Sequence, residues 1–170
     1  MWLPIAGQTV LTRRRLLFAA VAVALSGCGG DPSPKTTDLR FQVDADDFIN
    51  PNTENVASPV VVRIYELKQT SAFSNASLFD LLDSDTTILA QDLVSKREIE
   101  IKPGEKQSFS RSTPLETQYI GVIAGFRNLD GATWRATTEI KPEHSALVVV
   151  KLTAQTVTIN VTQDKTLGLF

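Results

Sequence analysis

The sequence predicts an all-β protein, an antiparallel sandwich or barrel of about eight strands, and two patterns indicate this fold class. Short segments alternate between apolar and polar residues with a period of two, which is typical of half-buried strands. Clusters of Gly, Pro, Asn and Asp separate these segments, as turns between neighbouring strands do. Hydrophobic residues make up 42% of the 170 positions, so the chain can bury a core and wholesale disorder is excluded.

The first predicted strand covers residues 39–45, where Leu39, Phe41, Val43 and Ala45 alternate with polar residues. The further predicted strands cover residues 59–67, 98–101, 107–111, 118–126, 134–140, 146–152 and 156–162.

In the strand predicted over residues 134–140, Trp134 belongs to the apolar side of the alternation. We expect it to face inward with Ala136 and Ile140, because the intervening Arg135 and Glu139 are charged.

One segment between the second and third predicted strands follows a helical pattern instead. Residues 77–80 have the Ser-x-x-Asp spacing of a capping box. Leu78, Leu81 and Leu82 then share one helical face. We therefore predict a short inserted helix of about two turns, which packs through these leucines or Phe79 because so short a helix is marginal alone.

The N-terminal segment is typical of an export signal. Arginines 13–15 precede an apolar run over residues 16–25, which is too short to span a bilayer. Residues 25–28, Leu-Ser-Gly-Cys, resemble a bacterial lipobox, which implies cleavage before Cys28 and acylation of its thiol, the only one in the chain. Gly29 in place of Asp after this cysteine favours the outer membrane. General secretory and twin-arginine export both stay open.

These signals divide the chain into three parts. Residues 1–27 are interpreted as a lipoprotein signal peptide, and residues 28–37 as the acylated cysteine with a linker rich in Gly, Pro, Ser and Thr. Residues 38–170 then form the β-sandwich domain.

The composition argues against several function classes. The chain has 17 basic and 19 acidic residues, whereas nucleic-acid-binding domains usually carry a basic face. One Cys and one His leave no zinc cluster and no internal disulfide. His144 falls in a predicted turn, and the aspartates within residues 44–47 and 83–85 lack the spacing of a calcium loop. We therefore predict no catalytic residue, no metal site and no cofactor.

A long loop is predicted between the first two strands. Residues 46–58 span thirteen positions, whereas hairpin connections usually use about two to five. Phe48 and Ile49 lie among polar residues and are candidate anchors for a partner. The run Asn50-Pro51-Asn52 is expected near the tip, which it would stiffen. The alternative is that Phe48 and Ile49 fold back and cap the end of the sandwich.

A set of short motifs carries a family resemblance. The motifs are Ser-Pro-x-x-Val-Arg-x-Tyr-x-Leu from Ser58, Gly-x-x-Ala-x-Phe-Arg from Gly121, and Trp-Arg at Trp134. Together with residues 49–52, 73–82 and 101–104, they resemble the TssJ family of type VI secretion lipoproteins over roughly residues 28–162.

The resemblance implies more than the patterns alone. It implies a transthyretin-like β-sandwich that is anchored in the outer membrane and faces the periplasm. It also implies binding to the periplasmic C-terminal region of the inner-membrane protein TssM, in a membrane complex with TssL. In this family the loop between the first two strands contacts TssM, which again points to residues 46–58.

Two other function classes stay open at this point. The protein could be a ligand- or carbohydrate-binding lipoprotein, which requires a concave apolar pocket with a few polar groups. It could also be a periplasmic enzyme, in which case polar residues with perturbed pKa values should line a cleft.

The lipobox makes a direct prediction about the anchor. Changing Cys28→Ser removes the thiol that receives the lipid, so the variant is expected to be a soluble protein or an uncleaved precursor. Incorporation of radiolabelled palmitate measures this difference. Equal labelling of the wild type and the serine variant would contradict the assignment of Cys28.

Overall fold

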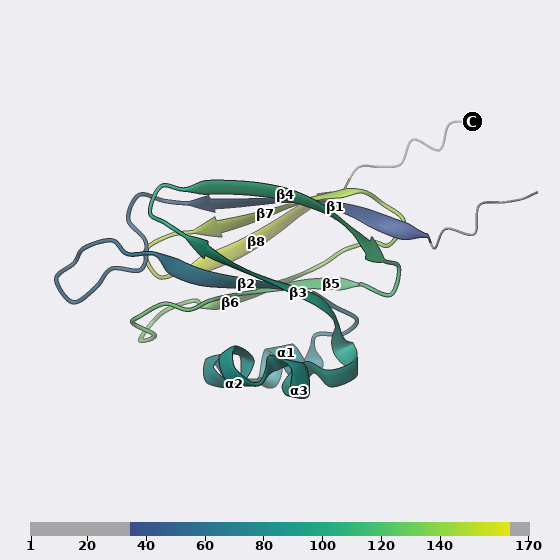
Figure 1. Cartoon of the computed structure of the whole chain (residues 1–170), viewed down its shortest axis with the longest axis horizontal. Helices are drawn as coiled ribbons and strands as arrows, with labels where there is room; N and C mark the ends of the chain where they lie inside the picture. The colour runs from purple at the N-terminus through teal and green to yellow at the C-terminus, as the bar shows by residue number, and fades with distance from the viewer. Residues whose placement is uncertain (1–34, 164–170) are drawn as a thin grey trace, which may run out of the picture. The chain divides into compact units, whose positions relative to one another are not determined.

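The computed structural model describes residues 35–163, which form a β-sandwich of two four-stranded sheets with short helices against one sheet (Figure 1). The strands are β1 (Thr36–Ala45), β2 (Val60–Leu67), β3 (Leu93–Ile101), β4 (Lys106–Pro114), β5 (Tyr119–Ala124), β6 (Arg135–Glu139), β7 (Ala146–Leu152) and β8 (Val157–Gln163). Each predicted strand is present, so the predicted eight-stranded sandwich is confirmed. The predicted signal peptide (residues 1–27) and the lipidation site Cys28 lie outside the described residues.

The strands are divided between sheet A, in the order β4-β1-β7-β8, and sheet B, in the order β3-β2-β5-β6. Neighbouring strands are antiparallel except β1 and β7, which pair in parallel with Phe41 opposite Val148. This one pair departs from the predicted antiparallel arrangement. The period of two that predicts both strands carries no information about their relative direction.

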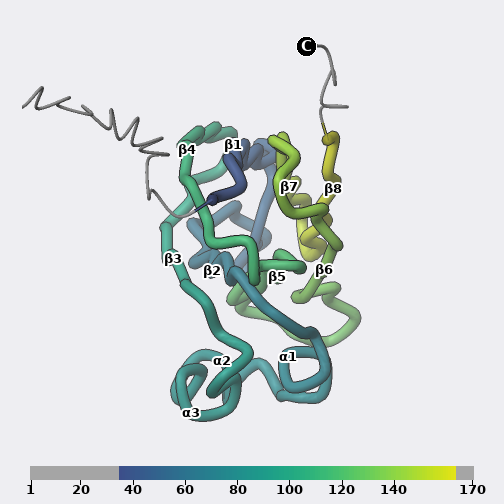
Figure 2. The backbone as a smooth tube through the Cα atoms, turned by 90° about the vertical axis from the view of Figure 1, so that its right-hand side faces the viewer, coloured from purple at the N-terminus to yellow at the C-terminus, as the bar shows by residue number. Residues whose placement is uncertain are grey.

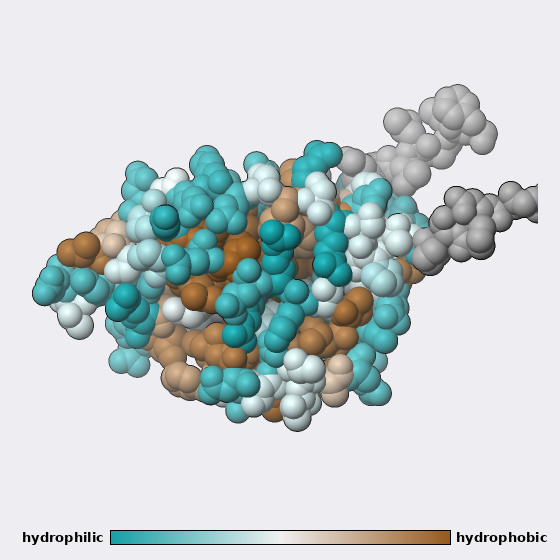
Figure 3. All heavy atoms as spheres, viewed as in Figure 1, coloured by the Kyte–Doolittle hydropathy of each residue, from teal (hydrophilic) through white to brown (hydrophobic). Residues whose placement is uncertain are grey.

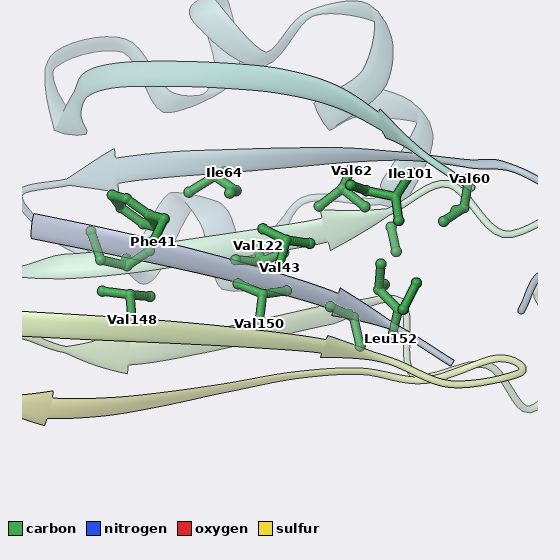
Figure 4. Close-up of a cluster of buried hydrophobic side chains, with 14 of the residues drawn as sticks. Phe41, Val43, Val60, Val62, Ile64, Ile101, Val122, Val148, Val150 and Leu152 are labelled. Atoms are coloured by element: carbon green, nitrogen blue, oxygen red, sulfur yellow. The ribbon is translucent and has the colours of Figure 1, made fainter. Parts of the chain in front are cut away.

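The main core lies between the two sheets and uses the alternate residues that the period-two pattern selects. Phe41 and Val43 of β1 are at most 1% exposed, and Val62 and Ile64 of β2 are at most 3% exposed. Figure 4 shows these side chains pointing toward one another from the two sheets. Their removal from water is the main stabilising contribution, at about 25 cal/mol per Å² of apolar surface.

One inward-facing residue of β2 is charged. Glu66 is 4% exposed, and its carboxylate forms an ion pair with Arg111, whose Nε lies 2.6 Å from Oε1, and accepts a hydrogen bond from the Thr113 hydroxyl. Burial raises the pKa of the Glu66 carboxyl, although the contacts with Thr113 and Arg111 oppose this shift. Both partners belong to β4, so the contacts connect β2 of sheet B with the edge of sheet A.

The opposite face of β2 is buried as well, because the helical layer covers the outer side of sheet B (Figure 2). Tyr65 and Leu67 are fully buried there with Phe73 and Leu81. The helices approach the sheet closely: a Cβ atom added to Gly121 of β5 would lie 2.9 Å from the Phe73 ring. Strand β2 therefore lies at the centre of a three-layer arrangement.

The helical layer is larger than the single helix that the sequence predicts. It consists of α1 (Ser71–Asn75), α2 (Leu78–Asp83), α3 (Asp85–Leu89) and the short 3₁₀ helix η1 (Ala90–Asp92). The capping box of α2 and the burial of Leu78 and Leu81 are confirmed, but Phe79 points away from the sheet and is 64% exposed. The other helices lack a readable period because each has five residues or fewer. Within the part of the chain that the structure describes, no helix is long and apolar enough to cross a membrane.

Hydrogen bonds to sheet B hold these short helices in place. Asp85 of α3 accepts bonds from Lys96 Nζ, at 2.7 Å, and from the Tyr65 hydroxyl, at 3.2 Å. Arg63 donates through Nη1 to the carbonyls of Leu81 and Leu82 at the end of α2. Helix ends leave carbonyl groups without partners, so this arginine satisfies groups that burial would otherwise penalise.

The electrostatic setting of Asp85 follows from these contacts. Burial alone would raise the pKa of its carboxyl, but the bonds from Lys96 and Thr86 outweigh burial and hold the pKa below its usual value. The carboxylate is therefore charged and stabilises the helical layer at neutral pH.

The environment of Trp134 corrects one expectation. Ile140 is buried as predicted, whereas Trp134 is half-buried and packs against both the main core and the helical layer. Arg135 also does not simply face water: its guanidinium carbon lies 4.6 Å from the centre of the Trp134 ring, and Nη1 donates to the Phe73 carbonyl at 2.8 Å. The sequence pattern could not indicate that helices cover this side of sheet B.

Trp134→Ala is expected to lower the free energy of unfolding by about 2–3 kcal/mol, less than the roughly 3–5 kcal/mol of a fully buried tryptophan. The loss arises because one ring contributes to both hydrophobic clusters. Chemical denaturation measures it. A change below about 0.5 kcal/mol would contradict the packing role of the ring.

Candidate partner-binding site

The loop between β1 and β2, residues 46–59, lies at the end of the sandwich opposite the start of β1 (Figure 1). Thr36 begins β1 at one end, and Ala45 ends it at the other. A ten-residue strand spans about 33 Å at roughly 3.3 Å per residue. The start of β1 and the β1–β2 loop are therefore separated by the length of the sandwich.

Asn50 organises the base of this loop. Its Nδ2 donates to the Pro59 carbonyl at 2.6 Å, and its Oδ1 accepts from the Arg127 amide at 2.8 Å. Its own amide donates to the Ala154 carbonyl at 2.8 Å. The residue has a φ of 45°, in the left-handed region that Asn tolerates better than most residues. Through its side chain and its backbone amide, this one buried residue thus joins three loops.

The predicted site residues separate into buried and accessible groups. Ile49 and Asn50 are 0% and 3% exposed and belong to the loop base, which for Ile49 agrees with the alternative that it folds back. Phe48 is 43% exposed, and Pro51 and Asn52 are half-buried. The expected anchor pair is therefore split, because Ile49 folds back into the core whereas Phe48 faces water.

Asn52 organises the tip of the loop. Its Oδ1 accepts from the amides of Glu54, at 3.0 Å, and Val56, at 2.9 Å. Its backbone amide donates to the Val56 carbonyl, and its carbonyl accepts from the Asn55 amide, both at 2.9 Å. The tip is thus a compact turn with its own hydrogen bonds, and a preformed loop loses little conformational entropy on binding.

A second turn supports the loop from the side. The Gly104 amide donates to the Asp46 carbonyl at 3.0 Å, and Asp46 in turn donates its amide to the Leu152 carbonyl at 3.0 Å. Gly104 has a φ of 72°, and an added Cβ would lie 2.6 Å from Oδ1 of Asp47. The positive φ favours glycine here, whereas the exposed Asp47 side chain could move away from an added Cβ.

The accessible surface of the loop combines apolar and acidic groups. Val56 is 55% exposed and Phe48 is 43% exposed, and the loop carries Asp46, Asp47 and Glu54 with no basic residue. Figure 3 shows both hydrophobic and hydrophilic residues on the protruding loop at the left. The sequence analysis does not include Val56 among the contact residues. Its position as a large apolar residue in the mostly polar run 52–58 could have indicated an exposed anchor. This surface suits a partner with an apolar pocket and basic groups around it.

A polar concavity of about 620 Å³ lies on the outer face of sheet A, near the start of β1. Its lining includes Asp38, Arg40, Ser110 and Ser112, and no aromatic residue lines it among residues 35–163. Pockets for small ligands are usually lined mainly by apolar and aromatic side chains. The concavity therefore gives the ligand-binding alternative little support.

The structure also places the single histidine of the chain. His144 lies in the turn before β7, where Nδ1 is 2.9 Å from the Pro142 carbonyl. In the described part of the chain, no group of three or more His, Cys, Asp or Glu residues could hold a metal ion.

The family of the chain follows from comparison with known proteins. Residues 37–164 match the family model T6SS-SciN, described as "Type VI secretion lipoprotein, VasD, EvfM, TssJ, VC_A0113". The chain belongs to this family. A search of curated protein sequences found no significant match.

Solved structures agree with this assignment. The crystal structure of the T6SS lipoprotein TssJ1 from Pseudomonas aeruginosa has a TM-score of 0.70 and 31% sequence identity, covering 76% of this chain and 97% of that chain. A chain in a structure described as the T6SS protein TssM C-terminal domain from EAEC has a TM-score of 0.61 and 28% identity, covering 72% and 99%. A chain in a structure described as the type VI membrane complex has a TM-score of 0.61 and 27% identity, covering 74% and 99%.

The two roles of asparagine in the loop can be separated by mutation. Asn50→Ala removes two side-chain hydrogen bonds and leaves alanine at a positive φ, so it is expected to cost about 2–3 kcal/mol of stability. Asn52→Ala affects only the exposed turn and should cost less than about 1 kcal/mol. Urea denaturation of both variants measures the difference. Equal losses would mean that Asn50 does not hold the loop base.

Proposed function

We propose that this type VI secretion lipoprotein is a structural component of the secretion machine that docks the periplasmic C-terminal region of TssM to the outer membrane. In this proposal Cys28 carries the lipid anchor, the domain faces the periplasm, and the assembled membrane complex also contains TssL. The role is mechanical rather than catalytic, so no cofactor is needed.

The observation that carries the proposal is the position of the β1–β2 loop relative to the start of β1. Eight positions separate Cys28 from Thr36, a connection of at most about 25–30 Å when fully extended. With the anchor attached before β1, the loop lies at the far end of the sandwich. It is then the part of the domain that reaches toward a partner from the inner membrane.

Two further findings support TssM as the partner. Chains similar to this one occur in a structure described as the TssM C-terminal domain and in one described as the type VI membrane complex. The loop is also built for binding, because its base and tip carry their own hydrogen bonds while Phe48 and Val56 remain exposed. Such exposed apolar side chains on a rigid support are typical anchors of protein interfaces.

A test of the loop has to leave its buried residues in place. Excision of residues 47–56 would also remove the buried Ile49 and Asn50, so a loss of binding would not be separable from a loss of folding. The double substitution Phe48→Ser with Val56→Ser changes only exposed side chains and leaves the loop base intact.

This double variant is expected to bind the TssM C-terminal fragment at least about tenfold more weakly in calorimetry, because each buried anchor commonly contributes more than about 1 kcal/mol. Its melting temperature should stay within a few degrees of wild type. Val61→Ser, an exposed valine on the outer face of sheet B, is the matched control and should bind normally. Unchanged affinity of the double variant would place the contact elsewhere on the domain.

A further inference from the structure

The helical layer exposes apolar side chains that its own packing does not use. Leu78 and Leu81 of α2 are at most 4% exposed and anchor the helix on sheet B. Phe79 is 64% exposed between them in sequence, and Ile88 of α3 is 38% exposed. The inner side of the layer is thus buried against sheet B, and its outer side exposes an aromatic ring to water.

The charge of this segment has a single sign. Residues 69–92 contain four aspartates and no Lys, Arg or His. Asp85 is paired with Lys96 and Arg63, but Asp83 is exposed and follows Phe79 by four positions, so both lie on one face of α2. The exposed ring is therefore flanked by negative charge.

Sheet B presents this surface rigidly although the helices are only five or six residues long. Arg63 binds the carbonyls at the end of α2, and Arg135 binds those of Phe73 and Ala76 at the end of α1. Isolated helices of this length are not stable in water. A surface held by such contacts is preorganised, which lowers the conformational cost of binding.

We propose that the outer side of the helical layer is a second docking surface, which takes a basic protein segment with an apolar residue that packs on Phe79. Charge decides between the possible occupants. An anionic membrane surface is repelled by the exposed aspartates. A two-fold contact with a second copy would place aspartates against aspartates, which is unfavourable. A segment with Lys or Arg around an apolar side chain complements both the exposed ring of Phe79 and the negative charge of the aspartates.

This surface lies on the outer side of sheet B and is separate from the β1–β2 loop at the end of the sandwich (Figure 1). Its assignment does not depend on the proposed function of that loop. A domain with both surfaces can contact two partner segments at once.

Photo-crosslinking in living cells of the source bacterium tests the proposal. The photoreactive residue p-benzoylphenylalanine replaces Phe79 in the full chain, and Thr158, an exposed position on sheet A, serves as the control site. The expected result is a protein adduct from position 79 only, whose crosslinked segment contains at least two Lys or Arg residues close to the attachment point.

A charge reversal completes the test. Asp83→Lys should reduce the yield of the adduct at least about fivefold, whereas Asp130→Lys, in an exposed turn outside the helical layer, should leave the yield unchanged. Thermal melting of each variant shows whether it is folded. The proposal is overturned if position 79 reacts only with lipid or with a second copy, if it reacts with a segment that lacks basic residues, or if it gives no more adduct than position 158.

Discussion

Burial of strand β2 on both faces is the constraint on which the rest of the structure depends. Val62 and Ile64 contribute to the core between the sheets, while Tyr65 and Leu67 lie under the helical layer. The alternate residue Arg63 is compatible with this burial because it bonds to helix carbonyls and pairs with Asp85 and Glu98. The family motif that begins at Ser58 therefore describes a strand with two different buried sides.

The same strand also positions the candidate site. Pro59 accepts a bond from Asn50 directly before β2 begins, and the Ser58 amide donates to the Ile49 carbonyl at 3.0 Å. The loop therefore leaves the sandwich from a base that these hydrogen bonds hold in place. Its exposed side chains are positioned by that base. A loop without these contacts would lose more conformational entropy on binding a partner.

The sequence predicts those parts of the fold that depend on short-range periodicity. Alternation, β-branched runs and turn residues located all eight strands, although β3 begins five residues before its predicted start, and the capping box at Ser77 located α2. Helices α1 and α3 were not predictable, because five residues give no period and α3 contains β-branched residues. The sequence could not show that Asn50 is buried while Val56 is exposed. Asn50 is held at the loop base by contacts with Arg127 and Ala154, which are remote in sequence.

We propose that the β1–β2 loop, at the end remote from the start of β1, carries the contact with TssM. Hydrogen exchange of the lipoprotein, measured with and without the TssM C-terminal fragment, tests it most directly. If the loop carries the contact, protection increases in residues 47–58 and in the supporting turn 102–105, with little change on the outer face of sheet A. Protection confined to sheet A, with an unchanged loop, would show that the contact with TssM lies elsewhere.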